Sequence, residues 1–269
     1  MKNSYRSELH PFHIVDASPW PIITAFSAFF MLFGLVLYMH SFFLGFQLLS
    51  LGFIAVVINA SLWWRDIVRE GTFEGVHSSY VRYGLKFGMI LFIVSEIMLF
   101  FAFFWAFFHS SLNPVPEIGC VWPPKGIHII NPWEIPLLNT VLLLTSGASL
   151  TWAHSAMFGG SLPEVISGLI LTIILAVLFT GFQVYEYRNA DFNINDGVYG
   201  STFYMLTGLH GGHVIIGTLF LSVALYRTVQ HHFTRQIHLG FEAAAWYWHF
   251  VDVVWIFLFL AVYVWGEGV

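Results

Sequence analysis

The sequence predicts an all-α membrane protein with seven transmembrane helices. Of its 269 residues, 58% are hydrophobic and only 9% are charged, whereas soluble domains carry about 25% charged residues. The apolar runs are long and continuous, which favours helices over the short alternating segments of a membrane β-barrel. An aromatic content of 19% excludes intrinsic disorder, and the net charge of -5 argues against a nucleic-acid-binding protein.

Seven apolar stretches are long enough for a bilayer crossing, which takes about 20 residues. We expect them at residues 19–39, 46–64, 81–108, 136–156, 163–185, 198–226 and 241–265. Proline stands at the start of several, as Pro19, Pro136 and Pro163, where its missing N–H costs no helical hydrogen bond. The third and sixth stretches exceed what a bilayer needs, so they should tilt or protrude.

Two connections organise the chain. His109–Trp133 is the longest, and its five prolines predict an ordered extended loop. The charged segment Arg65–Tyr80 is the one weak boundary, because it separates the first two spans from the other five. We therefore expect an N-terminal tail with a two-helix part at residues 1–70 and a five-helix bundle at residues 71–269, which together act as a single functional unit.

The basic residues predict the orientation, because cytoplasmic-type loops are rich in Lys and Arg. Eight of the ten lie on the side of the N-terminus and two on the other side, so the N-terminus should face the insertion side and the C-terminus the opposite side. The eight are Lys2, Arg6, Arg65, Arg69, Arg82, Lys86, Arg227 and Arg235; the two are Lys125 and Arg188. The short polar segment Met1–Asp16 is neither a signal peptide nor an Arg-rich transit peptide, which suggests insertion without a classical cleaved presequence.

Glu96 is the sharpest functional candidate, because ionisable residues within membrane spans are usually functional. It lies near the middle of the third predicted span, where low polarity favours the neutral acid. One interpretation is a proton-relay group or a reactive carboxyl. The other is a protonated acid that is hydrogen-bonded to a neighbouring helix, and the sequence leaves both open.

A second set of polar residues falls at similar depth on spans six and seven. His210 and His213 share one helix face, and so do His249 and Asp252. Grouped with Glu96, they have the imidazole and carboxylate ligands of an iron, zinc or copper site; the alternative is hydrogen bonding between spans three, six and seven. The histidine spacing does not suit a di-haem site, and the single Cys120 excludes a disulfide and a two-cysteine copper centre.

Two loops on the insertion side carry mixed polar residues at headgroup level. One offers Arg69, Glu70 and His77 beside Trp63 and Trp64. The other offers a basic cluster of Arg227, His231 and His232. Basic and imidazole groups there suit anionic or zwitterionic phospholipid, although charges that only set the topology would look the same.

Several runs resemble one family closely. They are HPFHIV at 10–15, SPWP at 18–21, WWRDIVRE at 63–70, FWAFFHSS at 104–111, CVWPPKGI at 120–127, PLLNT at 136–140, DGVYGSTFY at 196–204 and FEAAAWYWHFVDVVW at 241–255. Across nearly the whole chain the sequence resembles subunit III of the haem–copper oxidases, of the mitochondrial cytochrome c oxidase type. Two details depart from many relatives: His154 is followed by Ser155 rather than a second histidine, and His210 and His213 are separated by two glycines.

The resemblance implies a fold with helices one and two splayed from the other five and phospholipid between them. It implies a non-catalytic core subunit of the terminal oxidase that couples cytochrome c oxidation and O2 reduction to proton pumping. The chain itself would hold no haem, copper or other metal. Its partners would be subunit I, which holds the oxygen-reducing centre, subunit II, where cytochrome c docks, and smaller accessory subunits. The expected location is the mitochondrial inner membrane, with the N-terminus in the matrix and the C-terminus in the intermembrane space.

The resemblance also implies roles for particular residues. The family's carbodiimide-reactive intramembrane carboxylate, with its link to proton uptake, falls on Glu96. Its lipid-headgroup contacts fall on Trp64, Arg69, Glu70, His77, Arg227 and His232. Two alternatives remain: subunit III of a quinol oxidase, or a seven-helix transporter or channel. The second is disfavoured because spans one and two are nearly bare of polar residues that could line a pore.

Overall fold

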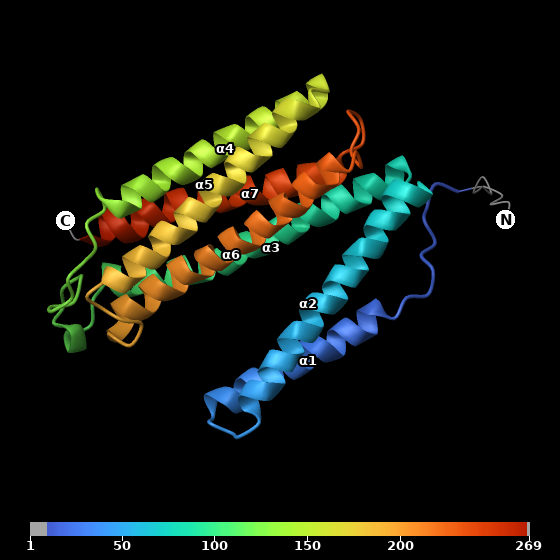
Figure 1. Cartoon of the computed structure of the whole chain (residues 1–269). Helices are drawn as coiled ribbons and strands as arrows, with labels where there is room; N and C mark the ends of the chain where they lie inside the picture. The colour runs from blue at the N-terminus through green and yellow to red at the C-terminus, as the bar shows by residue number, and fades with distance from the viewer. Residues whose placement is uncertain (1–9, 268–269) are drawn as a thin grey trace. The chain divides into compact units, whose positions relative to one another are not determined.

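The computed structural model describes residues 10–267 and confirms the predicted helical architecture. Within that range the chain forms seven long helices and no strand (Figure 1). They are α1 Trp20–Met39, α2 Gly45–Arg69, α3 Ser79–Leu112, α4 Ile135–Gly159, α5 Leu162–Asn189, α6 Gly197–Val229 and α7 Leu239–Leu258. By length and composition all seven could cross a membrane. Lys2 and Arg6, and with them the start of the expected N-terminal tail, lie outside the described residues.

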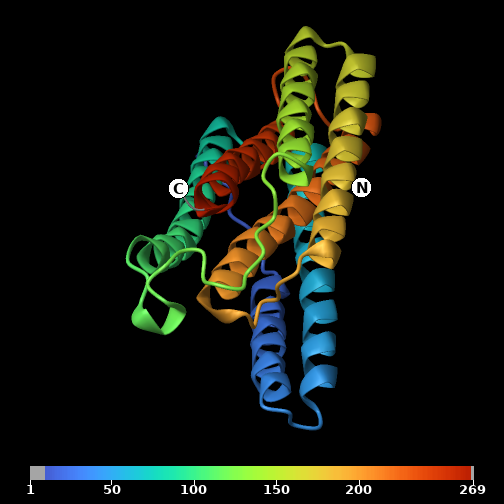
Figure 2. The ribbon, with the colours of Figure 1, turned by 90° about the vertical axis from the view of Figure 1, so that its left-hand side faces the viewer.

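Helix ends differ from the expected spans mainly in the headgroup region. α2 continues through Arg69 and is followed by a π-helical turn, Glu70–Glu74, so much of the expected Arg65–Tyr80 loop is helical. α3 likewise runs past His109 to Leu112. The hydropathy pattern predicts the end of a span at the first charged residues. The helix itself can continue beyond that point, because long charged side chains extend their heads into water. The remaining α3–α4 connection is an extended loop with one short 3-10 turn, Pro116–Ile118 (Figure 2).

The chain divides into two compact units, Met1–Leu85 and Lys86–Val269. The division falls inside α3 rather than in the charged segment before it. The expected functional division into residues 1–70 and 71–269 stays a prediction.

In the first unit, α1 and α2 form a hairpin whose backbones touch at glycines. A Cβ atom on Gly34 would clash with the backbone of Leu49, and one on Gly52 would lie 2.5 Å from the nitrogen of Met31. Small residues of this kind let membrane helices approach closely. Two polar contacts fix the register. The indole of Trp20 donates to Asp66 Oδ2 over 2.6 Å, and Asn59 donates to Ser27 Oγ over 3.0 Å.

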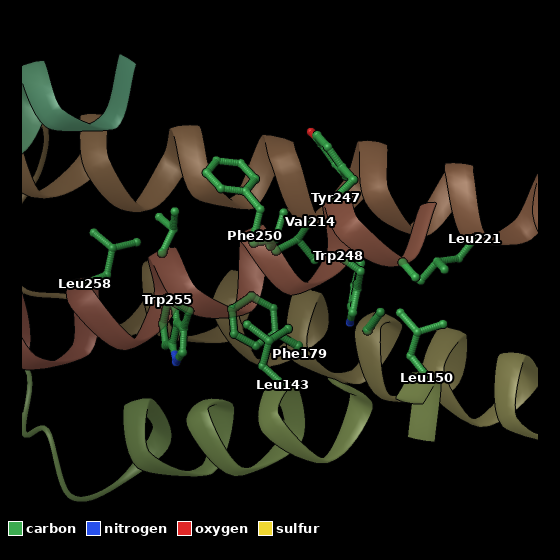
Figure 3. Close-up of a cluster of buried hydrophobic side chains, with 14 of the residues drawn as sticks. Leu143, Leu150, Phe179, Val214, Leu221, Tyr247, Trp248, Phe250, Trp255 and Leu258 are labelled. Atoms are coloured by element: carbon green, nitrogen blue, oxygen red, sulfur yellow. The ribbon is translucent and has the colours of Figure 1, made fainter. Parts of the chain in front are cut away.

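In the second unit, α4 packs against α5 and α7, and α6 packs against α5 and α7. Figure 3 shows the buried apolar side chains that these four helices share, among them Leu143, Phe179, Val214 and Trp248. A Cβ atom on Gly168 of α5 would lie 2.8 Å from that of Ala153 in α4. This interior positions the polar residues of α6 and α7.

The part of α3 that belongs to the second unit joins the other helices through large side chains. Phe100 packs edge-on against Phe250 of α7, with 6.1 Å between ring centroids. Phe107 meets Trp265, which lies in the 3-10 turn Trp265–Glu267 after the π-helical end of α7, Phe259–Val264. These contacts hold α3 where Glu96 can reach α6.

Candidate functional site

Glu96 of α3 and His213 of α6 form a close pair within the membrane-spanning region. Glu96 Oε2 lies 2.6 Å from His213 Nε2. His213 Nδ1 lies 2.8 Å from the carbonyl oxygen of Leu209. A carbonyl oxygen can only accept, so Nδ1 carries a hydrogen and donates it. Nε2 therefore faces the carboxyl group with either a lone pair or a second hydrogen.

This tautomer fixes how the pair holds its proton. If the imidazole is neutral, Nε2 accepts a hydrogen bond from a protonated Glu96. If the imidazole is charged, Nε2 donates to the carboxylate of Glu96. In both forms one proton lies between Oε2 and Nε2, and the two forms differ only in the atom to which it is bonded. The pair is thus a place where a proton can be kept and exchanged.

Aromatic rings enclose the imidazole. The ring of His213 lies 5.0 Å from that of Phe100, 6.3 Å from Tyr247 and 6.2 Å from Phe250, measured between centroids. Low polarity strengthens the electrostatic attraction within the pair. The side chain of Glu96 is still 20% exposed, against 9% for His213, so the carboxyl group is the open side of the pair.

The other intramembrane polar residues do not join this pair. His210 is buried, with Nε2 3.2 Å from the carbonyl oxygen of Val251 in α7, and its ring packs on Trp255. His249 Nδ1 lies 3.7 Å from Asp252 Oδ2 along α7. Within residues 10–267, the ligand atoms of Glu96, these histidines and Asp252 form no group of three close enough to share a metal ion. The contacts of His213 and His210 join neighbouring helices, whereas His249 and Asp252 meet within α7.

The lipid-contact candidates of the first unit lie around the end of α2. Arg69 Nε lies 3.4 Å from Glu74, and His77 Nε2 lies 3.9 Å from Glu70 Oε2. Trp64 is exposed. Burial is the main cause that lowers the pKa of His77 below its ordinary value, and the neighbouring His13 is the second cause. Arg69 and the indole of Trp64 are the most exposed groups of this set.

The lipid-contact candidates of the second unit lie at the end of α6 and just beyond it, with Arg227 in the last turn and His232 after the helix. The guanidinium carbon of Arg227 lies 4.4 Å from the ring centroid of Phe233, which is a cation–π arrangement. Burial, followed by the charge of Arg227, lowers the pKa of His232. An aromatic ring thus holds the side chain of Arg227 in place.

Sequence reasoning missed a buried carboxyl group, Glu186 of α5. Its Oε1 accepts from the hydroxyl of Tyr263 over 2.7 Å and from Gln183 Nε2 over 3.0 Å. Gln183 and Glu186 are three residues apart on one helix, which is a signal that the sequence offered. Tyr263 is far along the chain, so its part in the network required the structure. The group joins α5 to the C-terminal end of the helical region.

These features define the class of the molecule: a polytopic helical membrane protein with a small number of paired polar groups at membrane depth. A family model described as cytochrome c oxidase subunit III matches residues 10–267. A protein of Prototheca wickerhamii named cytochrome c oxidase subunit 3 is 60% identical over 257 residues, which cover 96% of this chain and 98% of that protein.

Two more relatives of the same name give the same picture. The one from Arabidopsis thaliana is 57% identical over 260 residues, covering 97% of this chain and 98% of its own length. The one from Chondrus crispus is 56% identical over 257 residues, covering 96% and 94%. The chain belongs to the cytochrome c oxidase subunit III family. It is a subunit of the multi-subunit oxidase complex, and neither a quinol oxidase subunit nor a transporter is favoured.

Proposed function

We propose that this chain is a non-redox core subunit that stabilises subunit I, binds phospholipid and supports proton uptake by the oxidase. Haem and copper would lie on partner subunits, with cytochrome c docking on subunit II. The observation that carries the proton-uptake proposal is the contact of 2.6 Å between Glu96 and His213. Membrane-embedded carboxylate–imidazole pairs are suited to proton relay.

The chemistry uses only the two side chains. The pair holds one proton in its resting form. A second proton delivered to Glu96 gives a neutral acid beside an imidazolium. The pair can then release one proton and return to its one-proton form. No bond other than the O–H or N–H bond is made or broken.

The conservative variant Glu96→Gln separates relay from packing. A glutamine amide can donate to His213 Nε2 and so keep the link between α3 and α6, but it cannot exchange a proton at neutral pH. We expect the variant complex to assemble and to show slower proton uptake during turnover, measured with a pH-sensitive dye. His213→Asn should have the same effect on proton uptake.

The matched control is Glu186→Gln, which alters a buried carboxyl group in a separate network. It should leave proton uptake unchanged. A carbodiimide should label Glu96 in the wild-type complex and lose that label in Glu96→Gln. Wild-type proton uptake in both Glu96→Gln and His213→Asn would overturn the relay and leave only the link between helices.

For lipid, we propose that Trp64, Arg69, Glu70 and His77 form one headgroup contact and that Arg227 and His232 form another. The supporting features are the exposed indole of Trp64 and the aromatic ring that holds Arg227. Arg69→Gln and Arg227→Gln should each reduce the phospholipid that copurifies with the oxidase in mild detergent, measured by mass spectrometry. Unchanged lipid content in both would contradict the proposal.

We also propose a mitochondrial inner-membrane location, with the N-terminus in the matrix. The high identity to relatives from mitochondria-bearing organisms supports the location, and the distribution of basic residues supports the orientation. Cys120, the one cysteine in the sequence, is exposed in the α3–α4 loop and allows a direct test. An impermeant maleimide should label it from the intermembrane side of intact mitoplasts; labelling only from the matrix side would reverse the orientation.

A further inference from the structure

A second cluster of titratable side chains lies in the second unit, apart from the Glu96–His213 pair. His154 comes from α4, His238 immediately precedes α7, and Glu242 lies in the first turn of α7. One ligand atom from each lies within 4.8 Å of the others. The spacing in the sequence does not reveal this group, because the fold brings the end of α4 to the start of α7.

His238 is oriented as a metal-binding histidine usually is. Its Nδ1 lies 2.9 Å from the carbonyl oxygen of Thr234, so Nδ1 donates its hydrogen there. In the neutral imidazole, Nε2 then keeps a lone pair, and this atom lies on the side of Glu242. Metal-ligating histidines almost always donate their second ring nitrogen to a carbonyl or carboxylate in this way, which fixes tautomer and ring angle. His238 is only 2% exposed.

The Nε2 atoms of both histidines are without hydrogen bonds. Among the described residues, neither His154 Nε2 nor His238 Nε2 has a hydrogen-bond partner, although both atoms are buried. The nearest carboxylate contact of His238 Nε2 is Glu242 Oε1, at 3.5 Å. Buried polar atoms are nearly always satisfied, so two bare imidazole nitrogens on members of one cluster call for an explanation.

Lys86 forms an ion pair with Glu242, one member of the cluster. Its ammonium nitrogen lies 2.5 Å from Glu242 Oε2, and its side chain is 41% exposed against 15% for Glu242. Lys86 therefore neutralises the carboxylate from the solvent-accessible side and leaves the two imidazole nitrogens unused. Aromatic rings close the other side. The ring of Phe158 lies 4.9 Å from that of His238, and the ring of Phe241 lies 5.5 Å from that of His154.

We propose that His154, His238 and Glu242 form a binding site for one divalent zinc ion, which displaces Lys86 from Glu242. Two imidazoles and one carboxylate are a zinc ligand set with a fourth position open to water, whereas calcium and magnesium prefer oxygen ligands. Tetrahedral zinc bonds of about 2.0–2.1 Å would require the three side chains to close in by small rotations. The bound ion joins α4 to the start of α7.

This site does not depend on the proposed role of the Glu96–His213 pair. A zinc site departs from the expectation that the chain binds no metal. Because zinc has no redox chemistry, the proposal still leaves the redox centres on partner subunits. A second group with similar ligand spacing, His13, Glu70 and His77 in the first unit, provides the internal comparison. It carries no proposal of its own, because Glu70 and His77 are already lipid-contact candidates.

The test uses the purified oxidase complex in mild detergent, treated with a chelator and dialysed against radioactive zinc ions. We expect one saturable zinc equivalent that is absent in His238→Asn and in Glu242→Gln. Lys86→Met should bind that zinc about tenfold more tightly, which is the size of effect typical of residues beside metal ligands. His13→Asn, the matched control, should retain it. Unchanged zinc binding in both ligand variants would overturn the proposal.

A zinc-edge anomalous difference map of the wild-type complex decides the question even if a ligand variant fails to assemble. The expected peak lies between the Nε2 atoms of His154 and His238 and the carboxylate of Glu242. Zinc bound only elsewhere in the complex, or no peak at saturating zinc, would refute the site.

Discussion

The indole nitrogen of Trp248 in α7 lies 2.9 Å from the hydroxyl oxygen of Ser146 in α4, and both residues are buried. The indole donates, and the hydroxyl in turn donates to the carbonyl oxygen of Leu143 over 2.6 Å. Ser146→Ala removes the acceptor and leaves a buried N–H group unsatisfied. We expect a loss of about 1 kcal/mol in the stability of the helical bundle, measured as a lower temperature of subunit dissociation. Ser110→Ala, at an exposed hydroxyl, should have no effect, and equal losses would contradict this account.

The close approach of α4 and α5 should be sensitive to a single methyl group. A Cβ atom on Gly168 would lie 2.8 Å from Ala153 Cβ and 3.0 Å from the carbonyl oxygen of Ser149. Gly168→Ala should therefore force the helices apart and cost about 1–3 kcal/mol. Gly181→Ala is the control on the same helix, because a Cβ atom added there would have no neighbour within 4 Å. This variant should be neutral. The measurement is the thermal dissociation of the subunit, and the prediction fails if the two variants match.

The network around Glu186 predicts coupling between two residues that are distant in sequence. Tyr263→Phe removes the donor that lies 2.7 Å from Glu186 Oε1, leaving the buried carboxyl group with only Gln183 as a donor to that atom. We expect a destabilisation of about 1–3 kcal/mol. A double-mutant cycle with Glu186→Ala, which removes the acceptor, should give a coupling energy of at least about 0.5 kcal/mol, the range found for residues in one hydrogen-bond network. A coupling energy of zero would show that the contact contributes nothing.

Acidification should loosen the segment after α2. The pKa of His77 is lowered by burial and then by the nearby His13, so the folded segment favours the neutral imidazole. Stability from this source is complete above the unfolded-state pKa of about 6.5 and is lost as the pH falls through that value toward the lower pKa of the folded state. The protection factors for hydrogen exchange in residues 75–79, which are corrected for the intrinsic pH dependence of exchange, should fall between pH 7.5 and pH 5.5. His77→Asn should abolish this dependence, and an unaltered pH profile in that variant would refute the assignment.

Much of the fold follows from the sequence because bilayer thickness sets helix length. The seven apolar stretches correspond to seven helices; Pro136 and Pro163 lie in the first turns of α4 and α5 as expected, and Pro19 directly precedes α1. The helix α2 ends later than the expected span 46–64. Hydropathy falls at Arg65 and Asp66, whereas the backbone continues as helix to Arg69. Helix ends in the headgroup region depend on side chains reaching water, which a hydropathy pattern does not record.

The candidate site was predictable only in part. Glu96 could be singled out because a carboxyl group in mid-span is costly. Its partner could not, since His210 and His213 share a helix face in the sequence and only the packing of α3 decides that His213 meets the carboxyl group. His154, His238 and Glu242 come from the end of one helix and the start of another, so no periodicity connects them.

The glycine contacts between α1 and α2 bear on how the chain is made. The buried residues of these helices are Ser27, Gly34, Gly45 and Gly52, and each meets a residue of the partner helix. The hairpin therefore needs nothing from later in the chain to complete its internal packing. N-terminal segments generally fold first during synthesis. The first two helices can thus pair in the bilayer while the ribosome is still translating the residues of α4 to α7.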